Sequence, residues 1–214
     1  APGPYEPPPP DPPGSADPPA ATINEGLWTV SGSEPAILRL APSQLLTSDN
    51  VSAATTVRTT TATLFTLSAV AFDAAGTMWI ASRDDSLVLA FSPAAIATSG
   101  TREASRVIAP TSRSLRGPTG LAFDPRHRLW VANFDDGTIV RFDSAQLASS
   151  GAPVPPKVLR IGGRPIALAF DAAGDLWVAQ FASHSIIKYS ATQLDFSESP
   201  VPEVVLSANA GSLT

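Results

Sequence analysis

Short apolar runs recur along this chain at a nearly constant spacing. Three stretches align over their whole length, starting at Ala69, Gly120 and Ala167, and a fourth copy that starts at Glu25 lacks the first part. Successive tryptophans are 51, 51 and 47 residues apart and mark the register of the copies: Trp28, Trp79, Trp130 and Trp177. A period near 50 residues that is filled with strand patterns is typical of the blades of a β-propeller.

Each copy predicts four strands, named A to D from the innermost strand outward. Strand A is an apolar run such as 120–123, strand B carries the tryptophan, and strand C alternates apolar and polar residues. A short helical turn follows, for which Ser92 suits the N-cap, Pro93 the first helical position and Gly100 the stop. Strand D then ends the copy, so the sequence predicts an all-β fold of four-stranded antiparallel blades.

A tight turn with the pattern Asp-x-x-Gly is expected between strands A and B. It runs from Asp73 to Gly76 and from Asp171 to Gly174, where the carboxylate can cap the turn and glycine supplies a positive φ. In the third copy His127 stands at the glycine position, and a turn role explains this histidine better than chemistry does. A tryptophan that recurs at one register is expected to pack between adjacent blades. Seven repeated residues are therefore predicted to be structural: Trp28, Trp79, Trp130, Trp177, Asp73, Asp124 and Asp171.

Composition separates a front tail from the repeats. Residues 1–22 are rich in proline and predict a disordered tail or linker, with docking to a proline-recognising domain as an alternative. The blades are expected at about 23–63, 64–115, 116–163 and 164–214. The 214 residues include no cysteine, only 15% charged residues and a net charge of −5. These features, with a first residue other than methionine, lead us to expect a secreted, periplasmic or envelope-associated protein of the bacterial type.

The segment 117–142, Gly-Pro-Thr-Gly-Leu-Ala-Phe-Asp through Leu-Trp-Val-Ala-Asn to Ile-Val-Arg-Phe, resembles an NHL-type propeller repeat. The resemblance covers about residues 25–210 and places the chain near the gluconolactonase-like and streptogramin-lyase-like propellers. It implies the fold and leaves the function open. The blade region lacks the basic face that RNA-binding NHL domains present, so no nucleic-acid partner is expected.

The first copy lacks strand A, and the C-terminal residues stop where another strand A is expected to begin. We therefore expect an incomplete ring, part of a six-bladed propeller, that is closed by further blades or by a second chain. A four-bladed ring closed imperfectly by residues 208–214 is the alternative.

In propellers of the resembled kind, the B–C and D–A loops surround the mouth of the central channel, where ligands bind. Two neighbouring Asp pairs there could attract a cation such as Ca²⁺ or a basic ligand, although the same residues are ordinary in hairpin turns. No catalytic residue, cofactor or definite metal site is predicted. The candidate ligand-binding residues are Arg83, Asp84, Asp85, Asn133, Phe134, Asp135, Asp136, Arg164, Gln180, Phe181 and His184.

The sequence favours a binding module for an unidentified protein or small molecule, without catalysis. One alternative is a lactonase- or lyase-like enzyme whose remaining ligands lie outside this chain. The other is a structural surface module.

Overall fold

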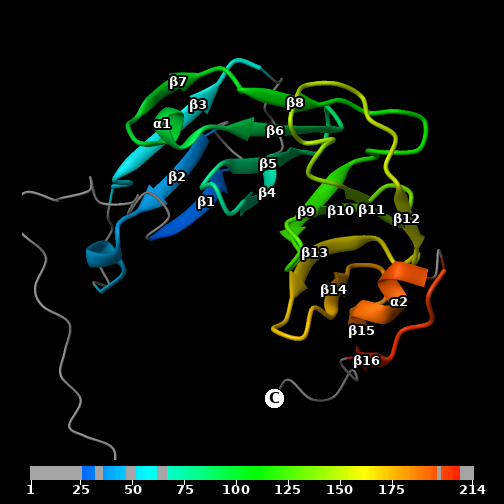
Figure 1. Ribbon diagram of the computed structural model, residues 1–214. Coiled ribbons are helices and arrows are strands. Elements are labelled where there is room, and N and C mark those ends of the chain that lie inside the picture. Colours follow the sequence, from blue (N-terminus) through cyan, green and yellow to red (C-terminus); the bar gives the residue numbers. More distant parts are fainter. Residues whose placement is uncertain (1–25, 32–35, 47–51, 62–66, 197–198, 208–214) are drawn as a thin grey trace, which may run out of the picture.

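The computed structural model describes residues 26–31, 36–46, 52–61, 67–196 and 199–207. Four four-stranded sheets follow one another in an arc that is open between the first and the last sheet (Figure 1). The predicted all-β propeller architecture is therefore confirmed. The proline-rich tail lies outside the described residues, and so does the C-terminal segment 208–214.

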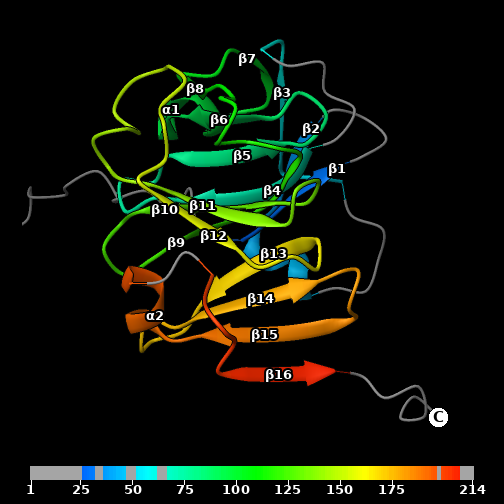
Figure 2. The ribbon, with the colours of Figure 1, turned by 90° about the vertical axis from the view of Figure 1, so that its right-hand side faces the viewer.

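Blades 2, 3 and 4 are antiparallel sheets whose strands follow chain order from the channel outward, as Figure 2 shows for blade 4. Blade 2 consists of β4 (Leu67–Phe72), β5 (Met78–Ser82), β6 (Leu87–Phe91) and β8 (Arg106–Ile108). Blade 3 consists of β9 (Pro118–Phe123), β10 (Leu129–Asn133), β11 (Thr138–Phe142) and β12 (Lys157–Arg160). Blade 4 consists of β13 (Pro165–Phe170), β14 (Leu176–Gln180), β15 (Ser185–Tyr189) and β16 (Val204–Ser207).

Blade 1 differs from the others at both edges. Its strands are β1 (Leu27–Ser31), β2 (Ala36–Leu40) and β3 (Thr55–Thr59), and β7 (Gly100–Arg102) adds a fourth strand parallel to β3. Trp28 lies in β1, at the position that strand B holds in the other blades. Within the described residues, blade 1 therefore lacks the innermost strand, as the sequence predicts.

The outer edge of each of the first two blades is extended by a loop from the next blade. Gly100 starts β7 and pairs with Val57 of β3, and Gly151 forms the equivalent parallel bridge with Ile108 of β8. The prediction that Gly100 ends a helix is wrong. The helix α1 (Pro93–Ile96) ends earlier, and Gly100 already lies in the strand that pairs with the outer edge of blade 1. These exchanged edges tie consecutive blades together.

Short helical turns connect strands C and D. In α1 the Ser92 side chain accepts a hydrogen bond from the Ala95 amide at 3.3 Å, and Pro93 is the first helical residue, as predicted. The equivalent segments are the 3₁₀ turn η2 (Pro42–Leu46) in blade 1 and α2 (Ala191–Phe196) in blade 4.

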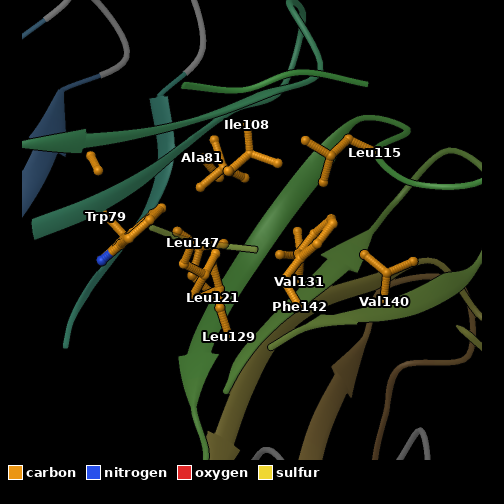
Figure 3. Close-up of a cluster of buried hydrophobic side chains, with 12 residues drawn as sticks. Trp79, Ala81, Ile108, Leu115, Leu121, Leu129, Val131, Val140, Phe142 and Leu147 are labelled. Atoms are coloured by element: carbon orange, nitrogen blue, oxygen red, sulfur yellow. The ribbon is translucent and has the colours of Figure 1, made fainter. Parts of the chain in front are cut away.

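The core consists of apolar layers between consecutive blades. Trp79 and Ile108 of blade 2 lie against Leu121, Val131 and Phe142 of blade 3, and all five are buried (Figure 3). Equivalent clusters join blade 1 to blade 2 and blade 3 to blade 4. Packing between the blades holds the innermost strands β4, β9 and β13 side by side around the channel.

Candidate functional site

The loops after strand B meet at one end of the blades. Arg83 of blade 2 donates from Nη2 to Asp135 Oδ1 of blade 3 at 3.2 Å, and its guanidinium carbon lies 4.4 Å from the centre of the Phe134 ring. Both contacts join residues about 50 positions apart in sequence, so the repeat brings these loops together across the blade boundary.

Aromatic and cationic side chains continue this contact into blade 4. The rings of Phe134 and Phe181 are 5.8 Å apart, and the ring of His184 lies 6.3 Å from that of Phe181. Arg164, from the loop that precedes β13, lies 5.3 Å from the Phe134 ring centre. We call Arg83, Phe134, Asp135, Arg164, Phe181 and His184 the mouth cluster.

The mouth cluster follows from the repeat register. Arg83, Phe134 and Phe181 are each the first residue after strand B of their blade. Phe181 is 53% exposed, and Arg164 and His184 are also exposed, whereas Phe134 is partly covered. The cluster therefore offers one open aromatic ring beside a cation and an imidazole, a combination that can contact a planar or negatively charged group.

Asn133 and Gln180 lie beneath the cluster and are buried. The Asn133 side chain accepts from the Arg116 amide at 3.0 Å and donates to the Ser114 carbonyl at 2.7 Å. Gln180 Oε1 accepts from Ser183 Oγ at 3.0 Å. Both side chains thus hold their loops in place from below.

Each of the two Asp pairs contains one residue that is hydrogen-bonded next to its turn and one that is exposed. Asp136 Oδ1 accepts from the amide and the hydroxyl of Thr138, and Asp85 accepts from Ser82 Oγ at 2.9 Å. Asp84 and Asp135 are exposed, and Asp135 pairs with Arg83. Within the described residues, no group of three or more His, Asp or Glu side chains is arranged to hold a metal ion.

The backbone at this end is held in unusual conformations. Arg164 and His184 have φ values of 54° and 48°, in the left-handed region that few residues other than glycine adopt. Gly117 has φ 58°, and a Cβ there would overlap the Asp135 carboxylate. Glycine adopts this conformation without strain, and Arg164 holds nearly the same φ at the equivalent position of blade 4.

Next to the cluster, the channel is lined by small and apolar side chains. A cavity of about 320 Å³ lies along the inner strands, bordered by Val30, Ala69, Gly120 and Ala167 among others. The hydroxyls of Ser68 and Thr119, whose residues line the same cavity, donate to carbonyls of the following blade, so the described channel wall offers mainly apolar contacts.

The opposite end of the blades carries a repeated pair of Asp and Trp. Trp79, Trp130 and Trp177 donate their indole N–H to the Asp six residues earlier at 3.0, 2.8 and 2.9 Å, and the same carboxylates accept from turn amides. The turn ends at residues 76, 127 and 174, with φ values of 76°, 59° and 83°. The backbone of His127 thus has the left-handed conformation that the turn requires.

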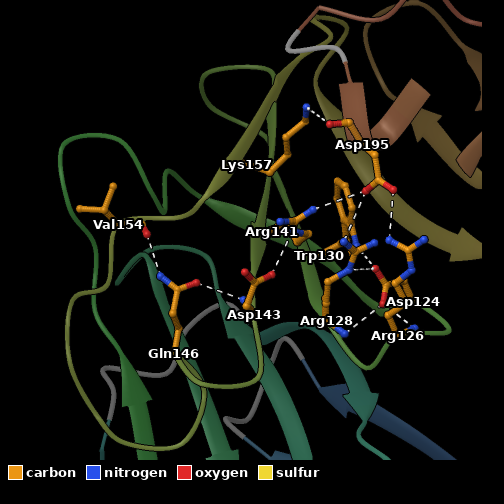
Figure 4. A network of polar contacts seen from close by, with 10 residues as sticks. All are labelled: Asp124, Arg126, Arg128, Trp130, Arg141, Asp143, Gln146, Val154, Lys157 and Asp195. Carbon is orange, nitrogen blue, oxygen red and sulfur yellow. Dashed lines mark hydrogen bonds and ion pairs between the residues drawn. The ribbon is translucent and has the colours of Figure 1, made fainter. Parts of the chain in front are cut away.

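Asp124 is the most enclosed of these carboxylates (Figure 4). Its burial raises its pKa, but hydrogen bonds from Trp130 and Arg128 and the charge of Arg128 outweigh this, so the pKa lies below the usual 3.8. Nearby, Asp195 of α2 pairs with Arg126, Arg128 and Arg141 across the blade 3–blade 4 boundary. Nothing in the repeat pattern indicated Asp195, because its partners lie more than 50 residues away.

In blade 4 the same end is more exposed. The pKa of Asp171 is lowered, first by the hydrogen bond from Trp177. Asp175 and Lys188 are 2.8 Å apart, and their hydrogen bond lowers the pKa of Asp175 and raises that of Lys188. These partners make the turn end a framework of paired polar atoms.

Solved structures share the fold of this chain. The chain superposes on virginiamycin B lyase from Staphylococcus aureus with a TM-score of 0.55 and 13% identity, covering 86% of this chain and 54% of that chain. The chain is a β-propeller. A streptogramin B lyase gives a TM-score of 0.55 at 11% identity, covering 80% of this chain and 50% of that chain. The extracellular domain of a one-component system from B. thetaiotaomicron gives a TM-score of 0.56 at 15% identity, covering 87% of this chain and 24% of that chain.

At these identities the likeness concerns the fold alone, and this propeller chain spans about half the length of the lyase chains it matches. No family model and no curated protein matches the sequence. Among the described residues, no helix is long and apolar enough to cross a membrane.

Proposed function

We propose that this propeller is a binding module without catalysis, and that the mouth cluster takes a small ligand that combines an aromatic ring with an anionic group. The observation that carries the proposal is the row of Arg83, Phe134 and Phe181 at one repeat position of three consecutive blades, with Phe181 53% exposed at its end. An aromatic ring can stack on Phe181, and the exposed Arg164 lies close enough to the row to pair with a carboxylate.

The charges of the cluster favour an anion over a cation. Asp135, the acid of the cluster, is already paired with Arg83, and the neighbouring Asp136 is hydrogen-bonded within its own turn. Arg164, which is exposed, contributes a positive charge that has no acidic partner within the cluster. The Ca²⁺ or basic ligand considered from the Asp pairs is therefore the weaker proposal.

Two probes that differ in charge test this proposal. N-acetyl-L-phenylalanine and L-phenylalaninamide share the ring but carry opposite charges at pH 6, where the carboxylate is ionised and the amine is protonated. In an NMR titration, the anionic probe is expected to shift the side-chain signals of Phe134, Phe181 and His184 saturably, and the cationic probe to shift them at least tenfold more weakly. Equal responses, or none, would contradict the proposal.

Two variants test whether the NMR response arises from binding at the mouth cluster. Phe181→Ala and Arg164→Ala are each expected to weaken binding of the anionic probe about tenfold, which corresponds to the 1–2 kcal/mol of one stacking or charge-assisted contact. Phe196→Ala is the matched control, since this phenylalanine is highly exposed but lies on α2 at the other end of blade 4.

The enzyme alternative rests on the lyases among the structural neighbours. His184 lies in the mouth cluster, whereas His127 belongs to the A–B turn at the opposite end, so the two histidines of this chain do not converge. Incubation with quinupristin, which is present in one neighbour's structure, is expected to leave its chromatographic retention unchanged. A new product that depends on His184 would favour the lyase alternative.

We further propose that the module works outside the cytosol. The low share of charged residues and the proline-rich leader support this, as do neighbours that are extracellular domains. Localisation of a tagged full-length protein by cell fractionation tests it.

A further inference from the structure

At every internal junction of the arc, two faces meet that are built from the same repeat positions. One face, which we call the leading face, presents the tryptophan of strand B, one aliphatic residue of strand C and one of strand D. Its members are Trp28, Ile37 and Val57 in blade 1, Trp79, Val88 and Ile108 in blade 2, and Trp130, Ile139 and Leu159 in blade 3. Each set is buried in one cluster with the following blade.

The opposing face, the trailing face, presents five positions of the following blade. They are Met78, Ile80, Leu89, Phe91 and Ile96 in blade 2, Leu129, Val131, Val140, Phe142 and Leu147 in blade 3, and Leu176, Val178, Ile187, Tyr189 and Leu194 in blade 4. All fifteen are buried. Burial raises the pKa of Tyr189 to about 12.

Blade 4 carries a leading face that no described residue covers. The register places Trp177, Ile186 and Leu206 at its three positions. Ile186 is 45% and Leu206 53% exposed, whereas their blade 3 equivalents Ile139 and Leu159 are fully buried. A surface hollow of about 360 Å³ borders Ile186 and Leu206, so the face has both apolar side chains and space between them.

Blade 1 carries the matching trailing face, at the other end of the arc (Figure 1). The same register places Leu27, Thr29, Leu38, Leu40 and Leu45 at the five positions. Leu27 is 49% and Leu45 47% exposed. One chain therefore presents both halves of an interface that it forms three times internally.

The inner rim of these two faces also matches. At the internal junctions, the hydroxyls of Ser68 and Thr119 donate to the carbonyls of Pro118 and Pro165 in the next innermost strand, both at 2.8 Å. In blade 4 the equivalent residue is Ile166, which has no hydroxyl to donate. The described part of blade 1 begins with β1, which is a strand B, and so includes no innermost strand to accept such a bond. The leading face of blade 4 thus suits a blade of the kind that begins with β1.

We propose that a second copy of this chain covers both faces, with the leading face of blade 4 of each copy packed on the trailing face of blade 1 of the other. Both contacts are equivalent, so two copies close on themselves instead of growing into a fibre. The four blades superpose on about half the length of the lyase propellers, which is the share that two copies need to complete a ring.

The test uses the 214-residue chain in sedimentation-velocity runs over a range of concentrations. We expect a reversible dimer with twice the mass of one chain. Ile186→Glu and Leu27→Lys are each expected to weaken dimerisation at least 100-fold, because each places a charge in both interfaces of a dimer of that variant. Mixing the two variants restores association, because the mixed dimer keeps one unaltered interface and brings opposite charges together at the other.

Val154→Glu is the matched control, because Val154 is 64% exposed and belongs to neither face. It is expected to dimerise like the unaltered chain, and circular dichroism checks that all variants stay folded. A chain that remains monomeric at every concentration would overturn the proposal and leave a further blade of the same repeat as the occupant. Dimers of Leu27→Lys as strong as those of the unaltered chain would also overturn it, since leading faces would then pair with each other.

Discussion

The two ends of the blades differ in how much of their chemistry repeats. At the turn end, the same Asp accepts from the same Trp in three blades at nearly the same distance. At the mouth, the residue after strand B is arginine in blade 2 and phenylalanine in blades 3 and 4. Repetition marks residues that every blade needs in order to fold, and variation at a fixed position marks the surface that is open to a specific role.

The largest effect is expected at the turn end. Trp130→Ala removes a fully buried ring that contacts blade 4, and we expect a loss of about 3–5 kcal/mol in the free energy of unfolding. Trp177→Ala is the comparison. Trp177 is only partly buried, so its removal should lower the free energy of unfolding by less. Urea denaturation at a concentration where the chain is monomeric measures both losses. Equal losses there would contradict the difference between an internal and an open face.

A smaller loss is expected from the buried amide beneath the mouth. Asn133→Ala leaves the Arg116 amide and the Ser114 carbonyl without their partner, and we expect a cost of about 1–3 kcal/mol. Asp136→Ala, at an exposed position of the loop that directly follows Asn133, is the control with a smaller cost. If Asn133→Ala is as mild as Asp136→Ala in urea denaturation, the mouth loops do not depend on this amide.

The lowered pKa of Asp124 makes the free energy of unfolding depend on pH under acidic conditions. The folded protein binds this proton less tightly than the unfolded chain, so the stabilisation is complete above the usual pKa of 3.8 and is lost as the pH falls through the lower folded value. Asp171 and Asp175 act in the same direction. Thermal unfolding between pH 5 and 2 should show a smaller acid-induced loss in Asp124→Asn than in the unaltered chain.

The smallest effect on folding is expected at the mouth surface. Phe181→Ala should change the free energy of unfolding by no more than about 0.5 kcal/mol, because the ring is mostly exposed. The same variant is expected to weaken binding of the anionic aromatic probe. A large loss of stability would place Phe181 with the framework residues, and the contrast between the two ends would fail.

The repeat register could be predicted from sequence because each blade obeys the same local rules. Strand B is recognisable from its tryptophan, and the turn from Asp-x-x-Gly and its His127 variant, since these depend on nearby residues. The exchanged edge at Gly100 could not be predicted, because the residues before β7 also resemble a helix stop and the pairing partner, Val57, lies in another blade.

The sequence by itself determined the blades, their order, the lack of an innermost strand in the described part of blade 1, and which loops gather at the mouth. Only the tertiary structure decided which of those loop residues are buried supports and which are exposed. It buries Asn133 and Gln180 as supports, leaves Phe181 and Arg164 open, and joins Asp195 to three arginines of blade 3. The physical reason is that strand periodicity and turn chemistry act over a few residues, whereas burial and charge pairing depend on which blades become neighbours.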